Sequence, residues 1–122
     1  FLFPLMHIRH TEELDKDLKK LCKKYPSILS DFEILKQVVI DNPTGKGASK
    51  HWNEISGISN KPEHISFYKV RMMCRSLRSS DLRVIYMYDG ENLELLFIET
   101  YYKVSQEKKK KNRIDAIVKK TI

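Results

Sequence analysis

The spacing of apolar residues in the first third of the chain predicts a strand followed by two helices. Residues 2–10 are apolar and then alternate with polar positions, which is typical of a strand. Thr11 is a typical helix N-cap, and apolar residues follow it at helical spacing until Pro26. A second helical stripe begins at Ser27 and ends at an Asn-Pro pair at 42–43. Because almost nothing joins the two helices, we expect an antiparallel helical hairpin.

In the second half of the chain the apolar period changes to two, which predicts three strands. They cover residues 65–75, 82–88 and 93–103 and are rich in Tyr, Val, Ile and Phe. The Asp-Gly-Glu-Asn sequence at 89–92 predicts a hairpin turn between the last two strands. Residues 105–122 carry a lysine run and then apolar residues at helical spacing, which predicts a basic amphipathic helix.

The connection at 43–64 is the least regular part of the pattern. It is rich in turn-forming residues and long for a loop in a compact domain. We expect Trp52 to anchor its middle, and the pattern leaves open whether a short strand or a helical turn forms there. The order of elements predicts an α+β fold: an N-terminal strand, a helical hairpin, a three-stranded antiparallel meander that completes a curved sheet, and a C-terminal helix. The two hairpin helices should cover one face, with the first strand at an edge or beside the last strand.

Composition narrows the class of protein. The 122 residues fit a single domain spanning 1–122. No apolar run approaches the ~20 residues that cross a bilayer, so we expect no membrane association. Two cysteines give no disulfide framework, which favours the cytoplasm. The formal net charge of +7 favours an anionic partner, either nucleic acid or an acidic protein segment.

Strand alternation groups several cations. Lys69 and Arg71 share one face of their strand, and Arg83 of the next strand can join them on the same sheet surface. Lys103 or Tyr102 would then lie at the end of that surface. In the last strand, alternation sets one face apart from the other: Phe97, Glu99, Tyr101 and Lys103 against Ile98, Thr100 and Tyr102. The simpler interpretation is a solvated polar face of an antiparallel sheet, on which Lys and Arg are common.

The stretch at 68–103, YKVRMMCRSLRSSDLRVIYMYDGENLELLFIETYYK, resembles the core of the RelE/ParE toxin superfamily. The shared pattern is a strand that opens Y-K-x-[KR], a strand reading [YL]-R-[VL]-[IV]-Y, a short turn and an apolar strand that ends in a basic residue. The hairpin that contains LKKLCKKYP is similar to the helical hairpin of that family. The resemblance implies a RelE-like α+β fold and a toxin of a type II toxin–antitoxin pair.

The resemblance also implies an activity and partners. RelE-type members cleave mRNA on the ribosome without a metal or another cofactor, and an acidic, helical antitoxin neutralises them in a hetero-oligomer. Residues that match the family's basic positions, together with a candidate tyrosine, are Lys69, Arg71, Arg83, Lys103 and Tyr102.

In the implied mechanism, the 2′-oxygen of the RNA attacks the adjacent phosphorus in line and leaves a 2′,3′-cyclic phosphate. Arg71 and Arg83 would stabilise the phosphorane charge, Lys69 would be the base, and Lys103 or Tyr102 would be the acid or a further clamp. Residues 75–81, RSLRSSD, form a polar, basic connection between the first two strands of the meander. Further RNA contacts are expected from this connection and from the lysine run, at Arg75, Arg78, Lys108, Lys109 and Lys110.

Two other functions stay open. RelE-type enzymes usually carry a tyrosine or histidine in the C-terminal segment, whereas SQEKKKKNRIDAIVKK contains neither. This departure favours either a ParE-like protein that inhibits gyrase by binding, or an inactive family member that binds only its antitoxin and DNA.

The histidines are weaker candidates. His7 and His10 have metal-ligand spacing but no identifiable third ligand, so an ordinary exposed pair is the simpler interpretation. His51 and His64 lie in the long connection, where either can reach a substrate surface.

Overall fold

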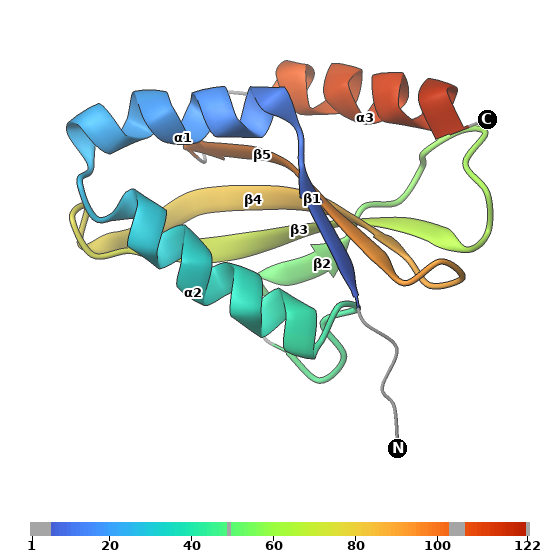
Figure 1. Cartoon of the computed structure of the whole chain (residues 1–122), viewed down its shortest axis with the longest axis horizontal. Coiled ribbons are helices and arrows are strands. Elements are labelled where there is room, and N and C mark those ends of the chain that lie inside the picture. Colours follow the sequence, from blue (N-terminus) through green and yellow to red (C-terminus); the bar gives the residue numbers. More distant parts are fainter. Residues whose placement is uncertain (1–5, 49, 103–106, 122) are drawn as a thin grey trace.

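A computed structural model describes residues 6–48, 50–102 and 107–121 of the chain. The described residues form an α+β fold with three helices and a curved, open, five-stranded sheet (Figure 1). Along the chain, the elements are β1 (His7–His10), α1 (Glu12–Lys24), α2 (Ile28–Asp41), β2 (Trp52–Glu54), β3 (Ile65–Cys74), β4 (Ser79–Asp89), β5 (Glu94–Tyr102) and α3 (Glu107–Thr121).

The strand order across the sheet is β1-β5-β4-β3-β2. β1 is parallel to β5, and the other neighbouring pairs are antiparallel. The predicted α+β fold, the meander of β3, β4 and β5, and the position of the first strand at the sheet edge beside the last strand are therefore confirmed.

The start of α1 shows how local sequence sets the fold. The Thr11 hydroxyl accepts the N–H of Leu14 at 3.1 Å, which caps the helix. The same hydroxyl donates to the carbonyl of Ile98 at 2.9 Å. The cap that the sequence predicted thus also fastens α1 to β5.

Each face of the sheet has its own apolar core. We call the face that packs against α1 and α2 the hairpin face, and the face that packs against α3 the α3 face. The hairpin face buries, among others, Leu14, Leu18, Phe32, Tyr68, Val70, Tyr86 and Phe97. The α3 face buries, among others, Phe67, Ile85, Ile98, Tyr101, Ile114 and Val118. Both hairpin helices therefore cover one face, as predicted.

The connection at 43–64 contains the short strand β2. Of the two structures that the sequence left open there, a short strand or a helical turn, the strand is the one that forms. The Trp52 indole N–H donates to the Tyr86 hydroxyl at 2.8 Å, and that hydroxyl donates to the Pro43 carbonyl at 2.6 Å. Gly45 has a φ of +65°, and a Cβ there would lie 2.7 Å from the indole. Glycine therefore lets the turn close over Trp52. Trp52 anchors the connection, as predicted.

The turn between β3 and β4 is tighter than the polar connection that the sequence predicted at 75–81. Cys74 pairs with Ser79, so β4 begins at Ser79 and only residues 75–78 form the turn. Arg78 adopts a φ of 56° to close it.

β5 contains a bulge that strict alternation missed. Ile85 of β4 pairs with Glu99, but the next residue, Tyr86, pairs with Phe97, so β5 has one extra residue at this point. Alternation predicted that Phe97, Glu99 and Tyr101 share a face. That prediction was wrong: Phe97 lies on the hairpin face, whereas Glu99 and Tyr101 lie on the α3 face. The bulge inverts the alternation in the rest of the strand.

Candidate nucleic-acid interface

Three of the predicted cations lie together on the α3 face of the sheet. In the pairing of β3 with β4, Arg71 lies directly opposite Arg83, and Lys69 lies directly opposite Ile85. Ile85 belongs to the α3-face core, and residues two apart on a strand share a face. Lys69, Arg71 and Arg83 therefore project from one surface, as the sequence predicted.

The Arg71–Arg83 pair places two positive charges directly opposite one another on neighbouring strands. Like charges directly opposite one another in an antiparallel pair destabilise the sheet. Arg71 is exposed and forms no ion pair with a described residue, whereas Arg83 is only 8% exposed. The Arg83 guanidinium donates to the carbonyl of Leu82 at 3.2 Å. Two adjacent guanidinium groups suit a phosphate, whose oxygens accept paired N–H donors.

The bulge in β5 decides which tyrosine joins this surface. Tyr101 pairs with Arg83 and packs in the α3-face core, where it is 4% exposed. Tyr102 pairs with Leu82 and packs against the core of the hairpin face. The structure therefore brings Tyr101, rather than the predicted Tyr102, beside Arg83. Lys103 lies outside the described residues.

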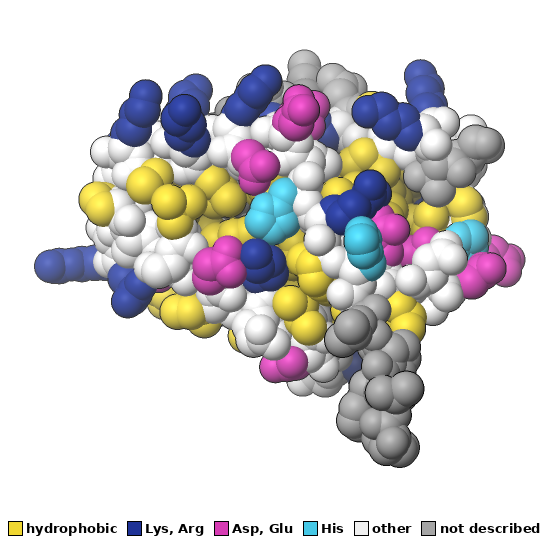
Figure 2. Space-filling view, in the orientation of Figure 1, with side chains coloured by type: hydrophobic (Ala, Val, Ile, Leu, Met, Phe, Trp, Pro, Cys, Tyr) yellow, Lys and Arg dark blue, Asp and Glu magenta, His cyan; other side chains and the backbone are white. Residues whose placement is uncertain are grey.

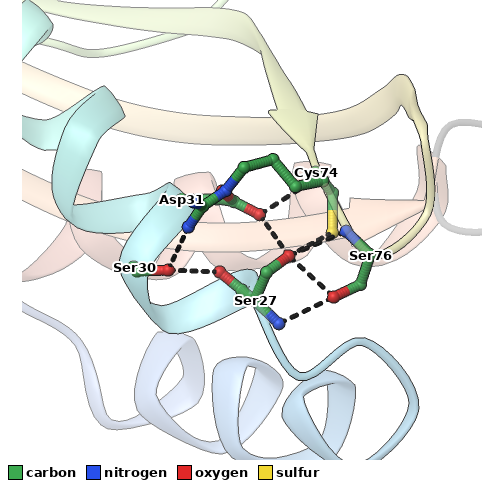
Figure 3. A network of polar contacts seen from close by, with 6 residues as sticks. Ser27, Ser30, Asp31, Cys74 and Ser76 are labelled. Atoms are coloured by element: carbon green, nitrogen blue, oxygen red, sulfur yellow. Dashed lines mark hydrogen bonds and ion pairs between the residues drawn. The ribbon is translucent and has the colours of Figure 1, made fainter.

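Arg75 has a protein partner on the hairpin side of the sheet (Figure 3). Its Nε donates to the Asp31 carboxylate of α2 at 2.7 Å, and its backbone N–H donates to the same carboxylate at 3.0 Å. Ser27 adds a third hydrogen bond to Asp31 at 2.7 Å. Burial opposes ionisation of Asp31, but the hydrogen bonds from Ser27 and Arg75 hold its pKa below the ordinary value. Arg75 thus fastens the β3–β4 turn to α2.

The structure does not show that the other predicted RNA-binding cations belong to this surface. Arg78 is exposed in the β3–β4 turn. Lys108, Lys109 and Lys110 belong to the first turns of α3, but their side chains lie outside the described part of the chain.

The histidines fall into three environments. His10 is the last residue of β1. Its Nδ1 lies 3.3 Å from the Asp15 carboxylate of α1 and its Nε2 lies 3.4 Å from the Lys36 ammonium of α2, so the ring contacts both hairpin helices. His64 lies 3.2 Å from Glu91 beside the β4–β5 turn, away from the cations. The part of the chain that the structure describes holds no group of three or more His, Cys, Asp or Glu residues arranged to bind a metal ion.

His51 is the histidine that lies next to the candidate surface. Its backbone carbonyl accepts the N–H of Arg71 at 3.0 Å. The sequence named His51 as one of two loop histidines that can reach a substrate, but only the pairing of β2 with β3 distinguishes it from His64.

Comparisons with solved structures identify this arrangement of strands and helices. The isolated RelE toxin of E. coli matches with a TM-score of 0.57 and 18% sequence identity, covering 97% of this chain and 100% of that chain. RelE in the archaeal RelE–RelB complex of Pyrococcus horikoshii OT3 matches with a TM-score of 0.55 and 16% identity, covering 83% of this chain and 98% of that chain. The chain has a RelE-like fold.

A metal-bound toxin from Helicobacter pylori has a similar RelE-like arrangement, with a TM-score of 0.50 and 20% identity over 80% of this chain and 94% of that chain. Searches against protein-family models and against curated protein sequences gave no match. No helix among the described residues is long and apolar enough to span a membrane.

Proposed function

We propose that this chain is the toxin of a type II toxin–antitoxin pair and that it cleaves mRNA on the ribosome. The observation that supports this function is the Arg71–Arg83 pair beside Lys69 on the α3 face of a RelE-like sheet. The pair concentrates positive charge on this face, and guanidinium groups suit a phosphate, whose oxygens accept paired N–H donors. No metal or other cofactor belongs to the proposed reaction.

The proposed chemistry is cleavage of the RNA by its own 2′-hydroxyl. The 2′-oxygen attacks the adjacent phosphorus, the bond from phosphorus to the 5′-oxygen breaks, and a 2′,3′-cyclic phosphate remains. Arg71 and Arg83 stabilise the charge that develops on the phosphorus oxygens, and each such donor contributes about 3 kcal/mol to the transition state. Lys69 lies on the same face of β3, two residues before Arg71, and adds a third cation. Lys103, as a further cation that holds the phosphate, remains a prediction.

An acidic, helical antitoxin fits the outer surface of the helical hairpin. A cleft of about 340 Å³ between α1 and α2 is lined by the apolar side chains of Leu18, Cys22 and Leu29. Its other lining residues are Lys19, Lys23 and Asp15, so the two lysines outnumber the one carboxylate. Figure 2 shows this apolar patch below a row of lysine side chains along α1. An amphipathic helix with acidic residues beside its apolar stripe would match both features. RelE of Pyrococcus horikoshii OT3 was solved in complex with RelB, which supports such a partner.

The function is tested by inducing the chain in bacteria and mapping the 5′ ends of cellular mRNA. Arg71→Gln is the informative variant because Arg71 is exposed, so its loss should leave the fold intact. We expect growth arrest with new cleavage sites inside translated codons for the wild type. Arg71→Gln should lower the cleavage rate about 100-fold. Lys46→Gln, an exposed cation in the turn after α2, is the matched control and should behave as the wild type.

Two results would contradict the nuclease activity, and a third would contradict its proposed site. Growth arrest with intact mRNA would point instead to gyrase, and a gyrase cleavage assay would then identify a ParE-like inhibitor. No arrest at all would leave a protein that binds only its antitoxin and DNA. Cleavage that Arg71→Gln and Lys46→Gln lower equally would place the activity elsewhere on the molecule.

A further inference from the structure

The pairing of β2 with β3 adds a fourth member to the row of residues across the α3 face. Trp52 pairs with Val70, and Asn53 pairs with Lys69. The N–H of Arg71 donates to the carbonyl of His51 at 3.0 Å, which continues the same register one residue before β2. This register sets His51 directly opposite Arg71.

The register of β2, continued to His51, assigns this residue to the α3 face. Trp52 packs against the core of the hairpin face, and successive residues on an extended chain point to opposite faces. His51 is half-buried. The row therefore runs across four neighbouring segments of the sheet as His51, Arg71, Arg83 and Tyr101. With strands about 4.8 Å apart, it spans about 14 Å.

His51 is the member of the row best suited to accept a proton. The Tyr101 side chain is only 4% exposed, and the Glu99 carboxylate on the same face is 1% exposed and lies 3.4 Å from the Arg113 guanidinium. The guanidinium groups of Arg71 and Arg83 carry only donors, and so does the ammonium group of Lys69. Attack by the 2′-hydroxyl requires a group that removes its proton. A neutral imidazole carries a nitrogen that can accept a proton, and histidine is the side chain that most often performs this step.

The anchoring of Trp52 also holds the residue before it, His51, in place. The indole is fixed by the Tyr86 hydroxyl, which is itself fixed by the Pro43 carbonyl. The backbone of His51 is tied to Arg71 on the other side. A proton-transferring group must be held this firmly, because small displacements from the reacting atoms cost large factors in rate.

We infer that His51 is the general base of the RNA cleavage proposed above, and the inference rests on that function. A phosphate bound by Arg71 and Arg83 lies one strand away from the imidazole. His51 takes the proton of the 2′-hydroxyl as the 2′-oxygen bonds to phosphorus. The bond to the 5′-oxygen breaks, and the leaving oxygen takes a proton from the ammonium group of Lys69, which yields a 2′,3′-cyclic phosphate and a 5′-hydroxyl. Lys69 is thus assigned as donor, in place of the base suggested by sequence alone.

The test uses the full chain with purified ribosomes programmed with a defined mRNA, and it measures the single-turnover cleavage rate. The variants are His51→Ala and His51→Gln, with His7→Ala as the matched control because His7 is exposed on β1. Free imidazole is then added to each. We expect both His51 variants to cleave at least about 100-fold more slowly at saturating ribosome, with half-saturation unchanged. Imidazole should restore part of the rate to His51→Ala only.

Glutamine separates catalysis from positioning, because its amide can keep a hydrogen bond but cannot accept the proton. A wild-type rate in His51→Gln would overturn the inference and leave His51 as a positioning residue for Arg71. A loss in His51→Ala that imidazole does not repair would overturn it as well. In both cases cleavage by the wild type would leave the proposed nuclease standing. If the wild type did not cleave the mRNA, both the proposed nuclease activity and the role of His51 would be contradicted.

Discussion

At the scale of single residues, two nearby arginines of the same chain segment have different roles. Arg71 faces the α3 side opposite a second arginine, whereas Arg75 is bound by the Asp31 carboxylate on the hairpin side. Sequence assigned RNA contacts to both. The distinction was not predictable because Asp31 lies 44 positions away from Arg75 and meets it only through the packing of α2 on β3.

Asp31→Asn should destabilise the protein by about 1–3 kcal/mol at pH 7, since it removes the charge from a buried hydrogen-bonded carboxylate. The pKa of Asp31 is depressed in the folded state, so its contribution is present above the unfolded pKa of about 3.9. That contribution is lost as pH falls through the lower folded pKa.

Chemical denaturation of both proteins between pH 3 and pH 7 checks this expectation. The difference in unfolding free energy should shrink as the solution becomes more acidic. A difference that stays constant down to pH 3 would contradict the role given to the charge. Ser30→Ala is a milder control, because Ser30 contacts Arg75 but not the carboxylate.

At the scale of elements, the sequence predicted the helices and the strands of the meander because their apolar periods are long and regular. It also predicted the Thr11 cap and the shared face of Lys69, Arg71 and Arg83. It missed the bulge, since one extra residue in β5 leaves no mark in an apolar run. The choice of Tyr102 over Tyr101 followed from that omission. The pairing of β2 depends on a tyrosine 34 positions away from Trp52, which no local pattern reveals.

Tyr86→Phe tests the anchor of β2. The change removes the acceptor of the Trp52 indole N–H and the donor to the Pro43 carbonyl inside a buried site. We expect a loss of about 1–3 kcal/mol in unfolding free energy. The fluorescence of Trp52, the one tryptophan of the chain, should shift in the folded state.

Tyr88→Phe is the matched control, because Tyr88 lies on the same strand and its hydroxyl makes no hydrogen bond with a described residue. It should stay within about 0.5 kcal/mol of the wild type. Equal effects of the two variants would show that the hydroxyl contacts of Tyr86 do not hold the connection.

At the scale of the whole molecule, Arg113 joins α3 to two other elements. Its guanidinium lies 2.6 Å from the Asp17 carboxylate of α1 and 3.4 Å from the Glu99 carboxylate of β5. Figure 1 shows α1 and α3 along the same border of the sheet. The ion pairs and the apolar contacts of Ile114 and Val118 together hold α3 on its face.

Arg113→Gln should loosen α3 without unfolding the sheet. The substitution removes both ion pairs while the apolar contacts of the helix remain, so local opening becomes easier. Hydrogen exchange measured by mass spectrometry should be about tenfold faster in α3 and unchanged in β3 and β4. Lys120→Gln is the control on the same helix, and equal exchange in the two variants would contradict the role of Arg113.

The parallel pairing of β1 with β5 has a consequence for how the chain is made. His7 pairs with Glu94, 87 positions later, so the first strand has no partner in the sheet until β5 has been synthesised. At about 5–20 residues per second, that interval is roughly 4–17 s. The α3 face, with its paired arginines, is closed by an element that emerges later still. A newborn chain therefore cannot complete the sheet that carries Lys69, Arg71 and Arg83 until β5 has been synthesised, and its α3 face stays uncovered until α3 follows.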